Sequence, residues 1–330
     1  MRKRAIAQIV SCSIIAVILT GFLLGALGCS AAGLIDGSLP NKALQKVVDT
    51  FEKTVTDLPI PEINLVGIPV ISDDDGSYNY GNGSYDETPT TIRIDWAAGR
   101  IVILATDEAT GVTLSEFLGN VDPMTASAGE IAESRRMRHR LTDGTLSVDQ
   151  FKANLTLHSG EPEATKTLLI TLPKSALKTI DIDVASAQVY LTDLTADKLD
   201  LDTASGALNV TGCAFGQVDI DTASGSGTFN ACSIGKLDVD SASAGMAFDL
   251  VNTPERIDVD SMSGSFSFAL PADASFKVDL DSISGKVTVE GFENVSVEGN
   301  KTVVNGGQYL YDFDMVSGNV AIEAQTGNKF

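Results

Sequence analysis

Aspartate is the residue type in this chain whose spacing most strongly suggests chemistry, because it recurs in Asp-x-Asp pairs at a near-constant interval. The first members of the pairs form what we call the first Asp column: Asp181, Asp200, Asp219, Asp238, Asp258, Asp279 and Asp312. The second members form the second Asp column: Asp183, Asp202, Asp221, Asp240, Asp260, Asp281 and Asp314. Regularly spaced carboxylates can bind divalent cations, bind a basic partner, or form a solvated acidic face.

The three interpretations differ in how they relieve repulsion between neighbouring carboxylates, about 1 kcal/mol per pair at ~5 Å in water. We favour a solvated face, which also blocks aggregation of one sheet on another. Lys198, Lys236, Arg256 and Lys277 lie two residues before members of the first Asp column, just before the first apolar position of their copies, and would neutralise part of the column. Calcium bridging adjacent repeats is the alternative, and no other cofactor is expected. Its ligands would be Asp181, Asp183, Asp200, Asp202, Asp219, Asp221, Asp238, Asp240, Asp258, Asp260, Asp279 and Asp281.

The aspartates belong to an internal repeat of about 19–21 residues, which determines the expected fold. Apolar residues at the first, third and twelfth positions of each copy alternate with polar ones, as in strands with one buried face. A single copy cannot bury this face, but stacked copies can. The sequence therefore predicts an all-β fold, a single-chain parallel β-solenoid with one coil per repeat. The copies begin at Ile180, Leu199, Val218, Leu237, Ile257, Val278 and, after a predicted hairpin or loop around residues 292–308, Tyr311.

Two further columns of the repeat are expected to be structural. An unbroken serine column occupies the corner of each copy, and no histidine lies within the repeats to activate a serine nucleophile. Cys213 and Cys232 are one coil step apart, within reach of a disulfide. Stacked parallel side chains orient poorly for that bond, so we expect two buried thiols.

The repeat resembles a bacterial β-strand-repeat family of unknown function whose members are labelled putative adhesins. The resemblance covers about residues 91–325. It is carried by TIRIDWAAGRIVI, RLTDGTLSV, LLITLP and the recurring Ser-Gly corner. It implies a membrane-anchored β-solenoid without catalytic residues. The chain departs from the pattern at Ala187 and Ala244, which replace the corner glycine, and in its denser aspartate columns.

The N-terminal 30 residues predict a membrane anchor. A basic start, Met1 to Arg4, precedes an uncharged apolar stretch, residues 5–28, long enough to span a bilayer. The basic flank should stay in the cytoplasm, so the bulk of the chain should be extracellular. Cys29 follows a sequence resembling a lipobox that lacks its usual leucine, and a lipoprotein modified at Cys29 is the alternative.

The remaining chain divides into four regions by composition and periodicity. Residues 31–71 form a helical juxtamembrane segment with a short amphipathic helix at 40–57. Residues 72–90 form an acidic Gly/Ser linker. Residues 91–175 form irregular N-terminal β coils, and residues 176–330 form the regular solenoid.

A basic island and a single tryptophan are the remaining candidates for a binding site. Arg135, Arg136, Arg138 and Arg140 could dock an anionic envelope polymer or a surface protein, or pair with acidic residues of the solenoid. Trp96 occupies an outward corner position and is expected to be exposed, where it could stack on a sugar.

Composition narrows the classes of function. The formal net charge of −21 disfavours nucleic acid as a partner, and two histidines in 330 residues disfavour zinc chemistry and a Ser-His-Asp triad. A carbohydrate-active enzyme is disfavoured because the acidic residues are spread evenly and Arg256 is the only arginine in the repeats. The sequence predicts a non-enzymatic surface module for binding, adhesion or scaffolding. The alternatives are a divalent-cation-binding surface protein and an accessory of envelope-stress signalling.

Overall fold

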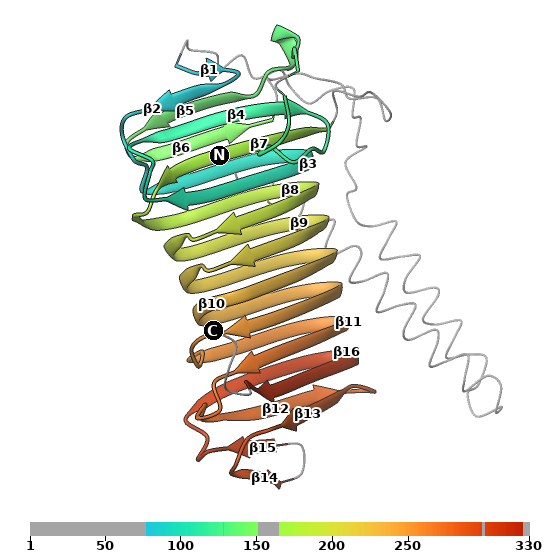
Figure 1. Ribbon diagram of the computed structural model, residues 1–330. Helices are drawn as coiled ribbons and strands as arrows, with labels where there is room; N and C mark the ends of the chain where they lie inside the picture. Colours follow the sequence, from blue (N-terminus) through green and yellow to red (C-terminus); the bar gives the residue numbers. More distant parts are fainter. Residues whose placement is uncertain (1–76, 128, 151–164, 299–300, 326–330) are drawn as a thin grey trace, which may run out of the picture.

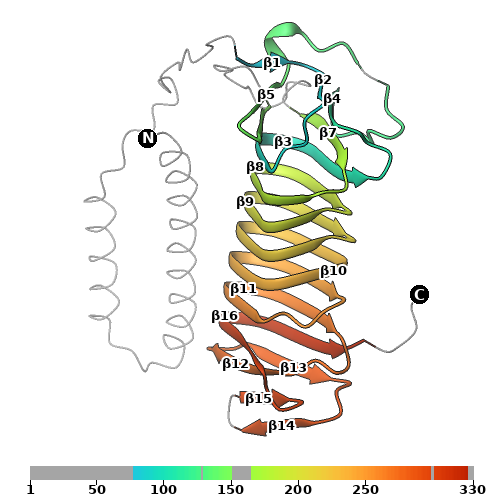
Figure 2. The same ribbon diagram turned by 90° about the vertical axis from the view of Figure 1, so that its left-hand side faces the viewer.

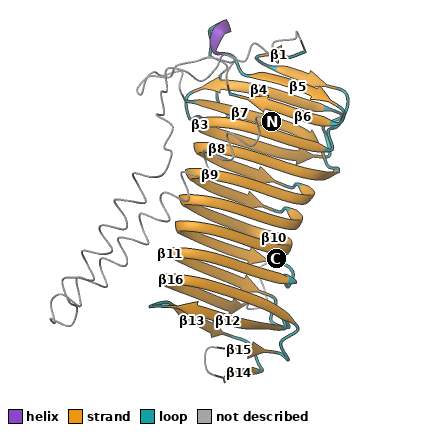
Figure 3. Ribbon diagram, turned by 180° about the vertical axis from the view of Figure 1, so that it is seen from behind, coloured by secondary structure: helices purple, strands orange, loops and turns teal. Residues whose placement is uncertain are grey.

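The computed structural model describes residues 77–127, 129–150, 165–298 and 301–325, which form an elongated stack of β coils (Figure 1). Apart from the 3-10 turn η1 (Glu133–Arg135), the regular elements of these residues are all strands (Figure 3). The predicted anchor, Cys29 and the amphipathic helix at 40–57 lie outside the described residues. No helix within the described ranges is long and apolar enough to cross a membrane.

The central coils are long strands that bend at the Ser-Gly corner and stack in parallel (Figure 2). They are β8 (Ala176–Thr192), β9 (Thr195–Thr211), β10 (Ala214–Leu250), which spans two copies, and β11 (Arg256–Leu270). Equivalent positions of successive copies pair in register, as Ile180 with Leu199 and Asp181 with Asp200. The parallel solenoid with one coil per repeat is confirmed.

The core lies between the two limbs of each coil and is filled by the apolar columns. The first position of every copy, from Ile180 to Tyr311, is almost wholly buried. Phe229, Phe248 and Phe268 occupy the twelfth position and stack with ring centroids 4.7 and 5.0 Å apart. Identical side chains therefore repeat along the axis, and each coil buries its apolar face only against its neighbours.

Cys213 and Cys232 are two buried free thiols, as the sequence predicts. Burial raises the pKa of the Cys213 thiol to about 12, so it remains protonated and packs as a small apolar side chain.

Chain order and stacking order differ at the C-terminal end. The relevant strands are β12 (Phe276–Ser282), β13 (Lys286–Glu290), β14 (Val295–Glu298), β15 (Lys301–Val304) and β16 (Tyr309–Ala324). The predicted hairpin is β14–β15, which pairs antiparallel. After it the chain turns back, and β16 inserts between β11 and the split coil formed by β12 and β13, pairing parallel with all three (Figure 1).

The N-terminal end of the stack has a similar arrangement, but its full coil comes before the split coil in sequence and not after it. Strand β3 (Thr91–Thr106) is a full coil that pairs parallel with β8 on one side. On its other side it pairs parallel with β6 (Thr145–Asp149) and β7 (Lys166–Pro173), which together form a split coil. Beyond them lie β5 (Arg138–Thr142) and β4 (Val112–Leu118), both antiparallel.

The expected linker at 72–90 is wrong for its second half. Residues 79–85 hold two short strands, β1 (Asn79–Tyr80) and β2 (Gly83–Tyr85). They pair antiparallel with β5 and β4 respectively and form the outermost layer of the stack. The sequence of these residues lacks apolar periodicity because so short an edge strand has little to bury.

Each end of the solenoid therefore has an inserted full coil, then a split coil, then antiparallel strands. The inserted coils come closest to their neighbours at the corner. Gly99 in β3 has φ +114°, and a Cβ there would lie 2.0 Å from the carbonyl oxygen of Lys166. Gly318 in β16 has φ +141°, and a Cβ there would lie 2.1 Å from that of Gly264. Only glycine fits these two corners.

The stacking order at the C-terminal end can be tested by cross-linking. Asn319 pairs with both Ser265 and Lys286. A Ser265→Cys, Asn319→Cys pair should cross-link readily with a short bifunctional reagent, because adjacent strands are ~4.8 Å apart. A Ser265→Cys, Lys286→Cys pair lies two strand spacings apart, about 10 Å, and should cross-link poorly. Peptide mapping measures both yields, and a higher yield for the second pair would show that the coils stack in chain order.

Candidate acidic face

Both Asp columns lie on the outer side of one limb of the solenoid, as the repeat predicts. Because β16 is inserted, the spatial order of the second column ends Asp260, Asp314, Asp281. The line of carboxylates also continues past Asp183 to Asp95 and Asp149, through the pairs Asp95–Asp183 and Asp95–Asp149. Sequence reasoning missed these two, although Asp95 lies in the TIRIDW segment that fits the repeat template.

The first column has cationic partners at several points along its length. Lys198 Nζ lies 3.0 Å from Asp200 and 2.6 Å from Asp219. Arg256 pairs with Asp258, so the predicted neutralisation by Lys198 and Arg256 is confirmed. Lys236 and Lys277 form no ion pair within the described ranges.

Two cations that sequence reasoning missed complete the set at the ends of the first column. Arg93 lies 3.2 Å from Asp181, and Lys301 lies 2.8 Å from Asp279. Arg93 comes from the inserted coil β3 and Lys301 from the hairpin strand β15, so neither neighbours its partner in sequence.

The second column is different, because from Asp183 to Asp281 it forms no ion pair with lysine or arginine in the part of the chain that is described. Partial desolvation against the neighbouring coils, together with the charge of adjacent carboxylates, raises the pKa of Asp202, Asp221, Asp240 and Asp260 to about 6. Hydrogen bonding to the Asp183 carboxyl contributes to the raised pKa of Asp202. The pKa of Asp95 is likewise about 6, because of its own desolvation and the charge of Asp149.

The calcium interpretation stays a prediction. Among the described residues, no three or more His, Cys, Asp or Glu side chains are arranged to hold a metal ion. The columns run in two parallel lines, so each carboxylate has neighbours along the axis rather than around a point.

The prediction that Trp96 is exposed is wrong, since its exposed fraction is 0%. Its indole Nε1 donates to the carbonyl oxygen of Lys166 at 3.3 Å, and the ring lies 5.4 Å from Lys166 Nζ. Trp96 pairs in register with Val184, and that column is buried in the neighbouring coils too, at Val184, Thr203 and Thr222, so the position points inward and not outward. Trp96 therefore cannot stack on a sugar in this structure.

Only two of the four arginines of the basic island lie together on one surface. Arg138 and Arg140 share a face of β5 and both stack on Tyr78, at 4.7 and 4.5 Å from the ring centroid. Arg138 also lies 2.6 Å from Asp149, as the pairing interpretation predicts. Arg135 lies in η1, and Arg136 follows it with its Nε donating to the carbonyl oxygen of Ile131, so these two are not on the strand. The four arginines do not form one exposed row.

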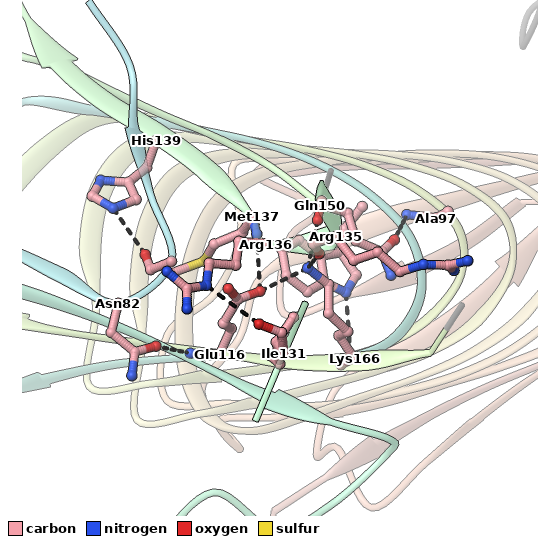
Figure 4. A network of polar contacts seen from close by, with 12 residues as sticks. Asn82, Ala97, Glu116, Ile131, Arg135, Arg136, Met137, His139, Gln150 and Lys166 are labelled. Atoms are coloured by element: carbon pink, nitrogen blue, oxygen red, sulfur yellow. Dashed lines mark hydrogen bonds and ion pairs between the residues drawn. The ribbon is translucent and has the colours of Figure 1, made fainter. Parts of the chain in front are cut away.

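A buried ion pair closes the N-terminal end of the core (Figure 4). Lys166 is 0% exposed, and its Nζ donates to Glu116 Oε2 at 2.6 Å and to the carbonyl oxygens of Gln150 at 2.6 Å and Arg135 at 2.8 Å. The same Glu116 oxygen accepts from the Met137 N–H. All three protons of the ammonium group therefore have acceptors, which indicates a structural role rather than a catalytic one. Nothing in the repeat pattern marks these residues.

The sequence of this chain matches the model of a known protein family. The model described as Toastrack DUF4097 matches residues 123–323, more than half of the chain. The chain belongs to the Toastrack DUF4097 family. The match includes both Asp columns and strands β12 to β15, and it extends into β16. The β-solenoid expected from the resemblance is the Toastrack fold.

Solved structures with similarity to this Toastrack chain share little sequence with it. A putative cell adhesion protein from Clostridium sporogenes is 13% identical, with a TM-score of 0.33, over 75% of this chain and 100% of that one. A putative adhesin from Bacteroides fragilis is 11% identical, with a TM-score of 0.39, over 74% and 97%. A comparison with curated proteins gives no match. Similarity at this level carries no information about a ligand.

The second Asp column predicts an unusual pH dependence for this Toastrack protein. Carboxyls with a pKa of about 6 in the folded chain bind protons more tightly there than in the unfolded chain, whose aspartates titrate near 3.8. Stability should therefore rise as pH falls from 7.5 toward 4.5. Differential scanning calorimetry in EDTA should show the melting temperature rising over this range.

An Asp202→Asn, Asp221→Asn variant provides the control for the pH experiment. It should be more stable than the wild type at pH 7.5 and depend less on pH. Burial lowers the pKa of His139, so His139 opposes the trend equally in both proteins. Equal pH profiles for both would contradict the assignment. A calcium-specific rise in melting temperature in the same assay would support the metal interpretation.

The buried ion pair predicts a large loss of stability on removal of one partner. Lys166→Met should lower the free energy of unfolding by about 3–5 kcal/mol, because it leaves the Glu116 carboxylate buried and uncompensated. Adding Glu116→Gln should recover part of this loss, because the amide oxygen can still accept from Met137. Urea titration measures both, and Lys174→Met, at an exposed ion pair, is the control that should lower stability far less. A small effect of Lys166→Met would contradict the structural role.

Proposed function

We propose that this Toastrack protein is a non-enzymatic binding module that holds a repetitive acidic face outside the bacterial membrane and docks cationic partner surfaces on it. The observation that carries the proposal is the second Asp column, a line of in-register carboxylates that lacks ion pairs among the described residues from Asp183 to Asp281. The first column shows that the fold accommodates cations beside such a line.

The electrostatics favour a cationic partner over a merely solvated face. The raised pKa values mean that ionised carboxylates are less stable here than in water, because of desolvation and mutual repulsion. A cationic surface laid on the column offsets both effects. A flat outer limb with one carboxylate per coil can also meet several charges of the partner at once.

The location is part of the proposal and rests on the sequence. The basic start and the apolar stretch at residues 5–28 would hold the chain in the membrane, or Cys29 would hold it as a lipoprotein. The solenoid then stands outside as a scaffold or adhesion module. An accessory of envelope-stress signalling is the alternative.

An enzymatic role has less support. One grooved surface brings Glu116 beside Arg136, and Glu116 also pairs with Lys166. Glu116 and Lys166 are buried and fully engaged with each other and with backbone groups. Neither can act on a substrate without breaking the contacts that close the N-terminal end of the core.

The proposal predicts that a simple polycation binds the second column. The full chain in detergent should bind a ten-lysine peptide. Asp183→Asn, Asp202→Asn, Asp221→Asn should weaken that affinity about tenfold, if each exposed contact contributes about 0.5 kcal/mol. Because binding lowers the pKa of these carboxyls, it should release more protons at pH 6 than at pH 8. Titration calorimetry in buffers of different ionisation enthalpy measures both quantities.

The matched control changes the same net charge elsewhere. Glu87→Gln, Glu108→Gln, Asp273→Asn removes three exposed carboxylates outside the columns and should leave the affinity almost unchanged. If both triple variants weaken binding equally, the peptide responds only to net charge and the proposed docking face is wrong.

A further inference from the structure

The acidic face is hollowed near its C-terminal end by a groove of about 350 Å³. Four carboxylates of the second column line it: Asp240, Asp260, Asp314 and Asp281. Beside them the groove is lined by Met262, Val316 and Ile283, the residues two positions after three of these aspartates. Acidic side chains therefore line the groove across four adjacent coils, and apolar side chains lie beside them on three of these coils.

The apolar side of the groove is confined to this end of the solenoid. The equivalent position is alanine in the first four copies, at Ala185, Ala204, Ala223 and Ala242. In the last three copies it holds Met262, Ile283 and Val316, which we call the apolar stripe. The insertion of β16 places Val316 between the other two. Sequence reasoning could have detected this change from small to large residues but did not.

The apolar stripe is only partly packed within the chain. Ile283 is 74% exposed, the largest fraction among the exposed large apolar side chains of the described residues, and Met262 and Val316 are partly exposed. A stripe of this kind next to ionised carboxylates is costly in water unless a partner covers it. The partner must be both cationic and apolar to match the two sides.

The spacing of the groove fits an α-helix lying across the coils. Adjacent coils are ~4.8 Å apart, and successive turns of a helix advance 5.4 Å, so over three intervals the two differ by only about 2 Å. The flexible stems of lysine and arginine absorb such a difference. A strand in the same direction repeats every ~6.8 Å on one face and would lose register by about 6 Å. A strand along a coil would meet only one carboxylate of the column.

We infer that the groove binds a basic amphipathic helix of a partner protein, with its lysines or arginines on the second Asp column and its apolar side on the stripe. This inference rests on the proposed function, because it assigns the partner's chemistry at one part of the acidic face. A second copy of the described region does not fit, since Arg138 and Arg140 are engaged with Tyr78 and Asp149.

The test separates apolar recognition from charge. The probe is an 18-residue helical peptide with lysines and leucines at i, i+4 spacing on adjacent sides, and the reference is the ten-lysine peptide. Met262→Ala, Val316→Ala, Ile283→Ala restores the alanine of the first four copies. It should weaken binding of the helical probe to the full chain in detergent at least tenfold, and leave the affinity for ten lysines unchanged.

Two controls make the result decisive. Val295→Ala, Val297→Ala removes exposed apolar side chains of β14 outside the groove and should change neither affinity. Asp281→Asn, Asp314→Asn keeps the stripe, should weaken both peptides, and serves if the alanine variant fails to fold by circular dichroism. Loss of ten-lysine binding in the wild type would refute the proposed function as well.

The inference alone is overturned if the wild type binds both peptides equally, or if the alanine variant keeps full affinity for the helical probe. It is also overturned if a sequence-shuffled peptide of the same composition binds as well as the helical probe. In each of these cases, binding of ten lysines that depends on Asp183, Asp202 and Asp221 would leave the proposed function intact.

Discussion

Parallel in-register stacking is the constraint from which the rest of this structure follows, because it places the same position of every copy above the last. For apolar positions the consequence is favourable, and a thin core continues along the axis with Phe229, Phe248 and Phe268 in one stack. For aspartate the same register brings like charges together at the strand spacing. Desolvation by the flanking coils and repulsion within the column then raise the pKa of residues such as Asp221 to about 6. The fold and the acidic face are thus two results of one geometry.

A parallel stack of coils leaves an unpaired strand edge at each end. The strands at the two ends, which we call the caps, cover these edges in similar ways. In each, a full coil is inserted between coils that are distant from it in sequence, and antiparallel strands then cover the last parallel edge. Antiparallel edges cannot continue the in-register columns, which opposes end-to-end growth. At the N-terminal end the core must also be closed, and Lys166 does so with an ammonium group that has acceptors for all its protons. The N-terminal end therefore carries a buried ion pair, whereas the described repeats bury only uncharged hydroxyls such as those of Thr203, Thr222, Ser241 and Ser261.

The features that could be predicted from the sequence are those that recur at the same position in every copy of the repeat. The apolar columns, the Asp columns and the bend at the Ser-Gly corner all follow from a step of 19–21 residues, and even β3 was recognisable from Ile92 and Ile94. The insertion of β16 was not predictable, because Tyr311 and Phe313 fit the same template wherever the coil stacks. Trp96 was misplaced because its column holds Thr or Ser in most copies and was read as outward, whereas Thr203 and Thr222 in that column are buried. The Lys166–Glu116 pair joins residues 50 apart, which no periodicity reveals.

The contrast between the two columns is the strongest argument about function. Lys198 and Arg256 show that a cation two residues before the first column can reach its carboxylates without disturbing the coil. Cations from the caps, Arg93 and Lys301, extend the same neutralisation to both ends of that column. The second column lies only two residues away, yet none of these side chains pairs with it. Stability alone would favour neutralising both lines. A line of carboxylates left available beside a neutralised one is what a surface requires if its counter-charges come from another molecule.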